Sequence, residues 1–160
     1  MVKSMAISKQ EFDRRVERFT EQCRCSGMKV THQRMEVFRE LAGTAEHPDA
    51  ESIYQAVSSR LPAISRDTVY RTLSMLEEAG LVKKAQALAG PARYDANIDR
   101  HHHFVCTECG LVRDIFSETL DKLPVPPAAQ RVGRVLSTHV QLQGICAACA
   151  AGKREKKRGS

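Results

Sequence analysis

Two C-x-x-C pairs constrain this 160-residue chain more than any other feature. They are Cys106–Cys109 and Cys146–Cys149, with residues 110–145, 36 in all, between them. Each pair can direct two thiolates at one tetrahedral metal, and two pairs complete the four-ligand shell of a structural zinc site. Because no secretory signal is evident, these cysteines are better interpreted as metal ligands than as disulfides. The sequence therefore predicts a closed Cys₄ site for Zn²⁺, without an open position for catalysis.

A run of three histidines directly precedes the first cysteine pair. Strand alternation would place His101 and His103 on one face and His102 on the other. Asp95 comes shortly before the run, and Asp114 lies on the strand expected to pair with it. Two imidazoles with carboxylates suit Fe²⁺, Mn²⁺ or Zn²⁺. We therefore predict a second, mixed metal site, with a solvent-exposed histidine cluster as the alternative.

Capping residues and apolar spacing predict four helices before residue 80. They begin at Ser8 (with Glu11 as a capping box), at Thr31, at Pro48 and at Ser65. The first carries a buried stripe, Phe12, Val16, Phe19 and Cys23. Cys23 lies on that stripe and Cys25 does not, so we interpret them as a buried and an incidental cysteine rather than a redox pair.

The fourth helix and the segments that follow it predict a winged helix-turn-helix. Residues 81–86 and 92–95 are expected to form a two-stranded wing, which makes the preceding helix the DNA reader. An exposed polar helix face is normally only solvated, but here it precedes a wing. Its side chains can contact phosphates and base edges, and Tyr70 can contact a thymine methyl group. The candidates on this helix are Arg66, Thr68, Tyr70 and Arg71.

Beyond Asp95 the chain changes to short strands and metal-ligand residues. We expect strands at 101–105, 111–115 and 134–143, with short helices at 117–123 and near 127–132. The predicted fold is α+β: a winged-helix domain at 1–95, a metal-binding domain at 96–152 and a basic disordered tail at 153–160. Residues 153–158 carry five positive charges and one negative, +4 of the net +6, so bulk charge says little about nucleic-acid binding.

The sequence offers no signal for a membrane. No apolar run approaches the roughly 20 residues that a membrane helix needs. The N-terminal residues also lack the apolar segment of a signal peptide. We expect a cytoplasmic protein with no membrane partner.

Five stretches, in this order, resemble the ferric uptake regulator (Fur) family. They are Gly-Met-Lys-Val-Thr-His-Gln-Arg (27–34), His-Pro-Asp-Ala-Glu-Ser-Ile-Tyr (47–54), Ser-Arg-Asp-Thr-Val-Tyr-Arg-Thr-Leu (65–73), His-His-His-Phe-Val-Cys-Thr-Glu-Cys-Gly (101–110) and Cys-Ala-Ala-Cys (146–149). The resemblance covers about residues 10–150. It implies a homodimeric repressor of a double-stranded DNA operator, with an N-terminal winged helix and a C-terminal α/β dimerisation domain.

The resemblance also assigns residues by position. The four cysteines match the structural zinc ligands. A regulatory Fe²⁺ or Mn²⁺ site at the hinge between domains is matched by His47, Asp95, His101, His103 and Asp114. His47 alone, at a helix start, would be interpreted as structural. Lys29 matches a minor-groove contact, and Tyr70 and Arg71 match recognition-helix residues.

Asp95 together with Asp114 resembles the peroxide-sensing branch of that family. In this branch Fe²⁺ reacts with peroxide and oxidises its own histidine ligands, and His47 and His101 match the oxidised pair. An additional metal site known in the family is poorly matched, since Arg100 and His102 have altered roles and His139 is one residue out of register. Gln143 replaces the usual aromatic residue before Gly144. We therefore expect no such extra site.

Three alternatives remain open at this stage. Within the same family, the chain could be an iron-responsive uptake repressor that uses the metal only as co-repressor. The His/Asp set could be a non-haem metalloenzyme centre, although little chain is left for a substrate pocket. A zinc-ribbon adaptor would explain the cysteines but leave Tyr70 and Arg71 without a role.

Overall fold

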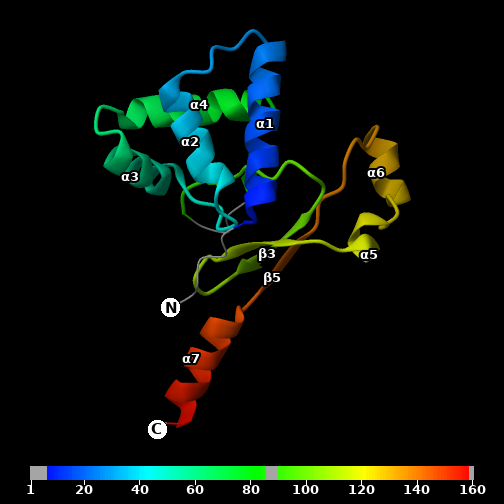
Figure 1. The fold of residues 1–160 in the computed structure, drawn as a ribbon. Coiled ribbons are helices and arrows are strands. Elements are labelled where there is room, and N and C mark those ends of the chain that lie inside the picture. The colour runs from blue at the N-terminus through cyan, green and yellow to red at the C-terminus, as the bar shows by residue number, and fades with distance from the viewer. Residues whose placement is uncertain (1–6, 86–89, 159–160) are drawn as a thin grey trace. The chain divides into compact units, whose positions relative to one another are not determined.

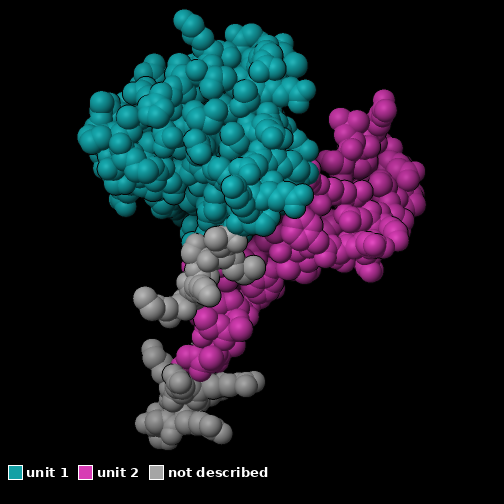
Figure 2. All heavy atoms as spheres, in the orientation of Figure 1, with its two compact units in different colours: residues 1–98 teal, residues 99–160 magenta. Residues whose placement is uncertain are grey.

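The computed structural model describes residues 7–85 and 90–158. The chain divides into two compact units, residues 1–98 and residues 99–160 (Figure 2). The division falls after Ile98.

Unit 1 is a group of helices followed by a two-stranded sheet. Its helices are α1 (Lys9–Cys25), α2 (His32–Ala42), α3 (Ala50–Arg60) and α4 (Arg66–Glu78) (Figure 1). Strands β1 (Lys83–Ala85) and β2 (Arg93–Asp95) pair antiparallel, with Lys83 opposite Asp95. The predicted wing is therefore present after α4, and residues 86–89 of its connection lie outside the described residues.

The three predicted N-cap residues are confirmed. The side chains of Ser8, Thr31 and Ser65 accept the backbone N–H groups of Glu11, Arg34 and Thr68 at 3.2, 3.3 and 3.1 Å.

The predicted start of the third helix at Pro48 is wrong. Asp49 caps α3 instead, since its Oδ1 accepts the Ser52 N–H at 2.7 Å. The carbonyl of Pro48 accepts the N–H of Tyr94 at 3.0 Å, which binds Pro48 to β2 and keeps it outside the helix.

The core of unit 1 confirms the apolar stripe of the first helix. Phe19 and Cys23 are fully buried, and the Phe19 ring stacks on Phe38 at 4.5 Å between centroids. Phe12 and Val16 pack at the edge of the same core. Burial raises the pKa of the Cys23 thiol, whereas Cys25 is exposed. The two side chains therefore occupy different environments, as a buried and an incidental cysteine would.

Unit 2 contains a three-stranded sheet in the order β4-β3-β5. Its strands are β3 (His102–Cys106), β4 (Val112–Ile115) and β5 (Gln141–Gly144), and its helices are α5 (Glu118–Asp121), α6 (Pro127–Val132) and α7 (Ala147–Arg158). The predicted β3–β4 hairpin is confirmed. β5 runs parallel to β3 and brings Gly144 opposite Cys106.

Two predictions for unit 2 are corrected. The strand expected at 134–143 is limited to Gln141–Gly144, because the ladder with β3 begins only where the His103 N–H reaches the carbonyl of Val140, at 3.1 Å. The tail expected to be disordered from residue 153 continues α7 as far as Arg158. Lysine, arginine and glutamate are good helix formers, which favours this continuation.

Among the described residues, no helix combines the length and the apolar character needed to cross a membrane.

Candidate metal centres and nucleic-acid interface

The predicted cysteines come together in unit 2. Cys106 ends β3, Cys109 closes the following turn, and Cys146 and Cys149 stand at the start of α7. Their sulfurs lie within 4.8 Å of one another, and those of Cys109 and Cys146 are 3.8 Å apart. Sulfurs about 2.3 Å from a tetrahedral zinc are separated by just under about 4 Å. The four side chains therefore fit one Zn²⁺.

Backbone N–H groups and neighbouring sulfurs shift the pKa values of these thiols in ways that favour binding of a cation. The N–H of Cys146 donates to the Cys106 sulfur at 3.3 Å, and N–H groups of Cys146 and Cys109 lower the pKa of Cys106 to about 6. Hydrogen bonds with the Cys146 and Cys109 sulfurs raise the pKa of Cys149 to about 12. The thiols of Cys106 and Cys149 therefore do not ionise together, and a dication would remove that obstacle.

The turn between the first two cysteines depends on Gly110. This residue has φ +71°, a conformation that L side chains rarely adopt. Its N–H donates to the carbonyl of Cys106 at 3.0 Å. The Thr107 N–H donates to the carbonyl of Gly144 at 2.8 Å, which links the turn to the end of β5.

A second set of donors lies on the same sheet of unit 2. The Nε2 atoms of His101 and His103 are 2.9 Å apart. Asp114 Oδ1 is 3.6 Å from the first and 3.7 Å from the second. Ligand atoms about 2.0–2.2 Å from one ion are separated by about 3–3.5 Å, so these three side chains fit a divalent metal. Both histidines are buried, which argues against an exposed cluster. The contact between their Nε2 atoms agrees with the predicted placement on one face.

Unit 1 contains a buried His–Asp pair of its own. His47 Nε2 lies 3.4 Å from Asp95 Oδ2, while Asp95 Oδ1 accepts the N–H of Asn97 at 2.7 Å. His47 is the one non-glycine residue of the described chain with positive φ, at 49°. Such a conformation costs about 1–2 kcal/mol and is found disproportionately at functional sites. The backbone carbonyl of His47 accepts a hydrogen bond from the Arg93 side chain at 3.4 Å. This bond helps to hold His47 beside β2.

The residues of the poorly matched extra site have other partners. His102 is fully buried; its Nδ1 accepts the Val140 N–H at 3.1 Å and its Nε2 lies 3.3 Å from Asp121 Oδ1. Arg100 contacts the same carboxylate oxygen at 3.0 Å. His139 instead contacts His103 at 3.0 Å. Within residues 7–85 and 90–158, neither His102 nor His139 belongs to a metal-ligating group.

The outer face of α4 presents two of the predicted DNA contacts to solvent. Tyr70 is 49% exposed, and the Arg71 side chain is 76% exposed while pairing with Asp67 at 2.6 Å. The opposite face of the helix is anchored by Val69, Leu73 and Leu76, all fully buried. This arrangement leaves the Tyr70 ring exposed to a ligand, while the Arg71 guanidinium would have to exchange Asp67 for a ligand.

Of the other three predicted contacts, Arg66 and Thr68 have side-chain partners within unit 1. Arg66 forms two hydrogen bonds of 2.9 Å with Glu51 and lies over the Tyr54 ring. The Thr68 hydroxyl is 2.9 Å from that of Ser65 in the helix cap. Lys29 is exposed, and its carbonyl accepts from Arg34 at 2.8 Å. Arg66 would have to exchange Glu51 for a phosphate in order to contact DNA.

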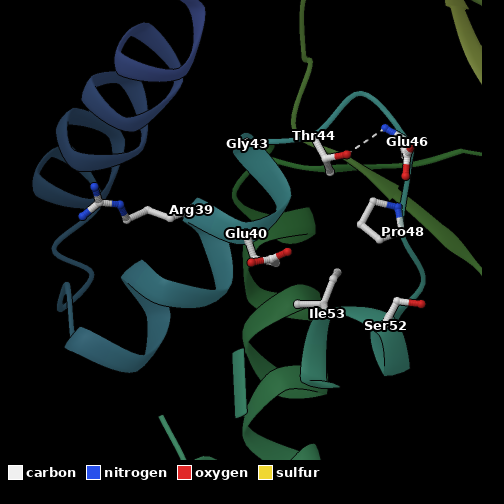
Figure 3. A pocket seen from close by; sticks show the side chains of 8 residues that line it. All are labelled: Arg39, Glu40, Gly43, Thr44, Glu46, Pro48, Ser52 and Ile53. Atoms are coloured by element: carbon white, nitrogen blue, oxygen red, sulfur yellow. Dashed lines mark hydrogen bonds between the residues drawn. The ribbon is translucent and has the colours of Figure 1, made fainter. Parts of the chain in front are cut away.

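A hollow of about 420 Å³ lies beside α2 in unit 1 (Figure 3). Polar groups on its wall already have partners. Glu40 accepts from Arg60 at 2.8 Å, and the Thr44 hydroxyl accepts the Glu46 N–H at 3.1 Å. We assign no ligand to this hollow.

Two contacts of the histidine cluster were not evident from the sequence. The carbonyl of Asp99 lies 2.8 Å from His101 Nδ1, and His139 Nε2 lies 3.0 Å from His103 Nδ1. Partial desolvation, followed by the neighbouring histidines, lowers the pKa of His139, although the residue is exposed at the surface. The isolated position of His139 in the sequence gave no signal for its contact with His103.

Comparisons with known proteins agree with this architecture. Residues 25–143 match the model of the ferric uptake regulator family. The peroxide-responsive repressor PerR of Staphylococcus epidermidis is 32% identical over 147 residues, which cover 91% of this chain and 97% of that protein.

Solved structures show the same fold. The ferric uptake regulator of Vibrio cholerae has a TM-score of 0.65 at 25% identity, covering 80% of this chain and 99% of the other. That of Helicobacter pylori has a TM-score of 0.69 at 21% identity, covering 87% and 93%. The chain therefore belongs to the ferric uptake regulator family and is a metal-binding, DNA-binding transcriptional regulator, not an enzyme.

Proposed function

We propose that this chain is a peroxide-responsive repressor with a regulatory Fe²⁺ or Mn²⁺. The observation that carries the proposal is the set of two imidazole nitrogens 2.9 Å apart beside the Asp114 carboxylate. Such a donor set is used by proteins to hold redox-active iron. The 32% identity to a peroxide-responsive repressor supports the same reading.

The regulatory site is proposed to combine donors from both units. His47 and Asp95 of unit 1 would join His101, His103 and Asp114 of unit 2 around one metal. Metal binding then favours the one arrangement of the units in which all five donors converge. If that arrangement also fits two DNA half-sites, metal binding and operator binding strengthen each other.

The chain is further proposed to act as a homodimer on operator DNA in the cytoplasm. Exposed apolar side chains of unit 2 support a protein interface: Phe116, Val132, Leu136, Leu142 and Ile145. The zinc ligands are Cys106, Cys109, Cys146 and Cys149. Operator contacts are assigned to Lys29, Arg66, Thr68, Tyr70 and Arg71.

Peroxide sensing rests on oxidation of a ligand histidine. Bound Fe²⁺ supplies the electron-transfer chemistry that activates peroxide. In the net reaction the O–O bond of one H₂O₂ breaks, one oxygen becomes bonded to a ring carbon of His47 or His101, and the other leaves as water. The modified ring binds metal less well, so the metal shared by the two units is released. The repressor then leaves DNA.

The test compares iron-loaded and manganese-loaded protein before and after low peroxide. The iron form should gain one oxygen atom on the peptide that holds His47 or His101, and it should release operator DNA. The manganese form should do neither, because Mn²⁺ does not readily reduce peroxide. Both readouts come from the same samples, by peptide mass spectrometry and by DNA-binding titration.

Two results would contradict the proposal in different ways. Unmodified histidines together with peroxide-driven release of DNA would exclude oxidation of the ligands. Retention of DNA by the iron form after peroxide would favour an iron-responsive uptake repressor, which uses the metal only as co-repressor.

A further inference from the structure

We propose that His139 is a positioning residue that fixes the ring of His103 and thereby sets the metal affinity of the regulatory site. This inference rests on the proposed function, since it assumes that His103 is a metal ligand. All of the contacts that carry it lie within unit 2.

The two nitrogens of His103 face different partners. Nε2 lies 2.9 Å from His101 Nε2 and 3.7 Å from Asp114 Oδ1, so it faces the candidate metal position. Nδ1 lies 3.0 Å from His139 Nε2, and the two ring centroids are 4.8 Å apart. His139 therefore contacts the nitrogen that a metal bound at Nε2 would leave available.

His101 shows the same arrangement with a different partner. Its Nδ1 lies 2.8 Å from the carbonyl of Asp99. A carbonyl can only accept, so His101 Nδ1 carries the hydrogen and Nε2 keeps its lone pair for a metal. For His103 to present its Nε2 lone pair in the same way, Nδ1 must donate, and His139 Nε2 lies 3.0 Å from it as an acceptor.

The main chain beside His139 is fixed on both of its hydrogen-bonding sides. The N–H of Val140 donates to His102 Nδ1 at 3.1 Å, and the carbonyl of Val140 accepts the His103 N–H at 3.1 Å. These bonds join β3 to the residue immediately after His139, just before β5 begins. The ring of His139 is thus held at the level of His103, although the two residues are 36 positions apart in the sequence.

Such a contact affects affinity because it fixes both the ring orientation and the tautomer of a ligand. Loss of an outer hydrogen-bond partner of a metal-bound histidine commonly weakens metal binding about 10–100-fold. His139→Leu should therefore raise the Kd for Mn²⁺ by about that factor. His139→Gln should bind Mn²⁺ within about three-fold of the unchanged protein, since its amide oxygen can accept the same bond.

The experiment measures Mn²⁺ affinity by competition with a chelator in the full-length protein. Zinc content and the thermal unfolding midpoint are followed in the same samples. Co²⁺ spectra report directly on the ligand field that His103 provides. His32→Leu serves as matched control, because His32 is an exposed histidine on α2 and should leave all readouts unchanged. His103→Ala tests the ligand itself.

The outcomes separate this inference from the proposed function. Weak binding by His139→Leu, recovery by His139→Gln and unchanged zinc content would establish the positioning role. If His139→Leu binds Mn²⁺ as tightly as the unchanged protein, or if His139→Gln fails to recover binding, the inference is overturned. If His103→Ala also binds normally, the proposed regulatory site itself is wrong.

Discussion

At Cys109, removal of one sulfur atom is expected to abolish the zinc site. Cys109→Ser leaves three thiols that cannot complete a tetrahedral shell. Since the cysteines join the end of β3 to the start of α7, loss of zinc should also loosen β5 and weaken the dimer. Zinc content by elemental analysis should fall from one per chain to near zero, and sedimentation should show a shift toward monomer.

Cys25→Ser is the matched control, because Cys25 is an exposed cysteine outside the four-sulfur group. It should retain both zinc and the dimer. Full zinc content in the Cys109→Ser protein would show that these sulfurs are not the ligands.

At the scale of a helix, the N-cap of α3 should make the stability of unit 1 depend on pH. The Ser52 N–H holds the pKa of Asp49 below its ordinary value of 3.8. Its stabilising contribution is therefore fully present above pH 3.8 and is lost as pH falls through the lower folded-state pKa. Asp49→Ala should lower the free energy of unfolding by about 1 kcal/mol at pH 7.

Asp49→Asn separates the charge of this cap from its hydrogen bond, because asparagine also caps helices well. The unchanged protein should exceed Asp49→Asn in stability at pH 7, and this difference should vanish as the carboxylate becomes protonated. Urea unfolding at several pH values measures it. A difference that is independent of pH would disprove a charged cap.

The sequence predicted those elements that local rules determine. Ser8, Thr31 and Ser65 cap helices because their hydroxyls reach an N–H three residues later, and this depends on no distant contact. The predicted helix start at Pro48 was wrong because the Pro48 carbonyl accepts a hydrogen bond from the N–H of Tyr94 in β2. The extent of β5 was likewise set by the ladder that β3 offers.

The candidate metal ligands also fall into two classes, those predictable from local sequence and those that depend on tertiary contacts. The four cysteines could be predicted from spacing, since two C-x-x-C turns have few other uses in such a chain. His101 and His103 followed from strand alternation. His47 required the family resemblance, because its strained backbone and its contact with Asp95 are tertiary features. The contact of His139 with His103 could be found only in the folded structure.

At the scale of the whole regulator, operator binding should depend on Tyr70 and Arg71. Each alanine substitution should cost about 1–3 kcal/mol of binding free energy if it removes a base contact. Tyr70→Phe should retain most of the affinity if the ring contacts a thymine methyl group. DNA-binding titrations of the Mn²⁺-loaded dimer at fixed salt measure these losses.

Arg14→Ala is the control for Arg71→Ala, since both arginines are exposed on a helix and pair with a nearby acidic side chain. It should leave operator affinity unchanged. If the alanine variants at Tyr70 and Arg71 bind normally while removal of residues 153–160 abolishes specific binding, α4 is not the reading helix.

The parallel pairing of β3 with β5 has a consequence for biosynthesis. Unit 1 is built mostly from contacts between neighbouring helices, so it can fold while the ribosome is still extending the chain. β3 is synthesised next, but its parallel partner β5 begins only at Gln141, and the last zinc ligand is Cys149. Until residues 141–149 leave the exit tunnel, one edge of β3 lacks its partner strand β5. Two of the four zinc ligands, Cys146 and Cys149, are also still missing. The order of translation therefore delays zinc capture until Cys149 has been made.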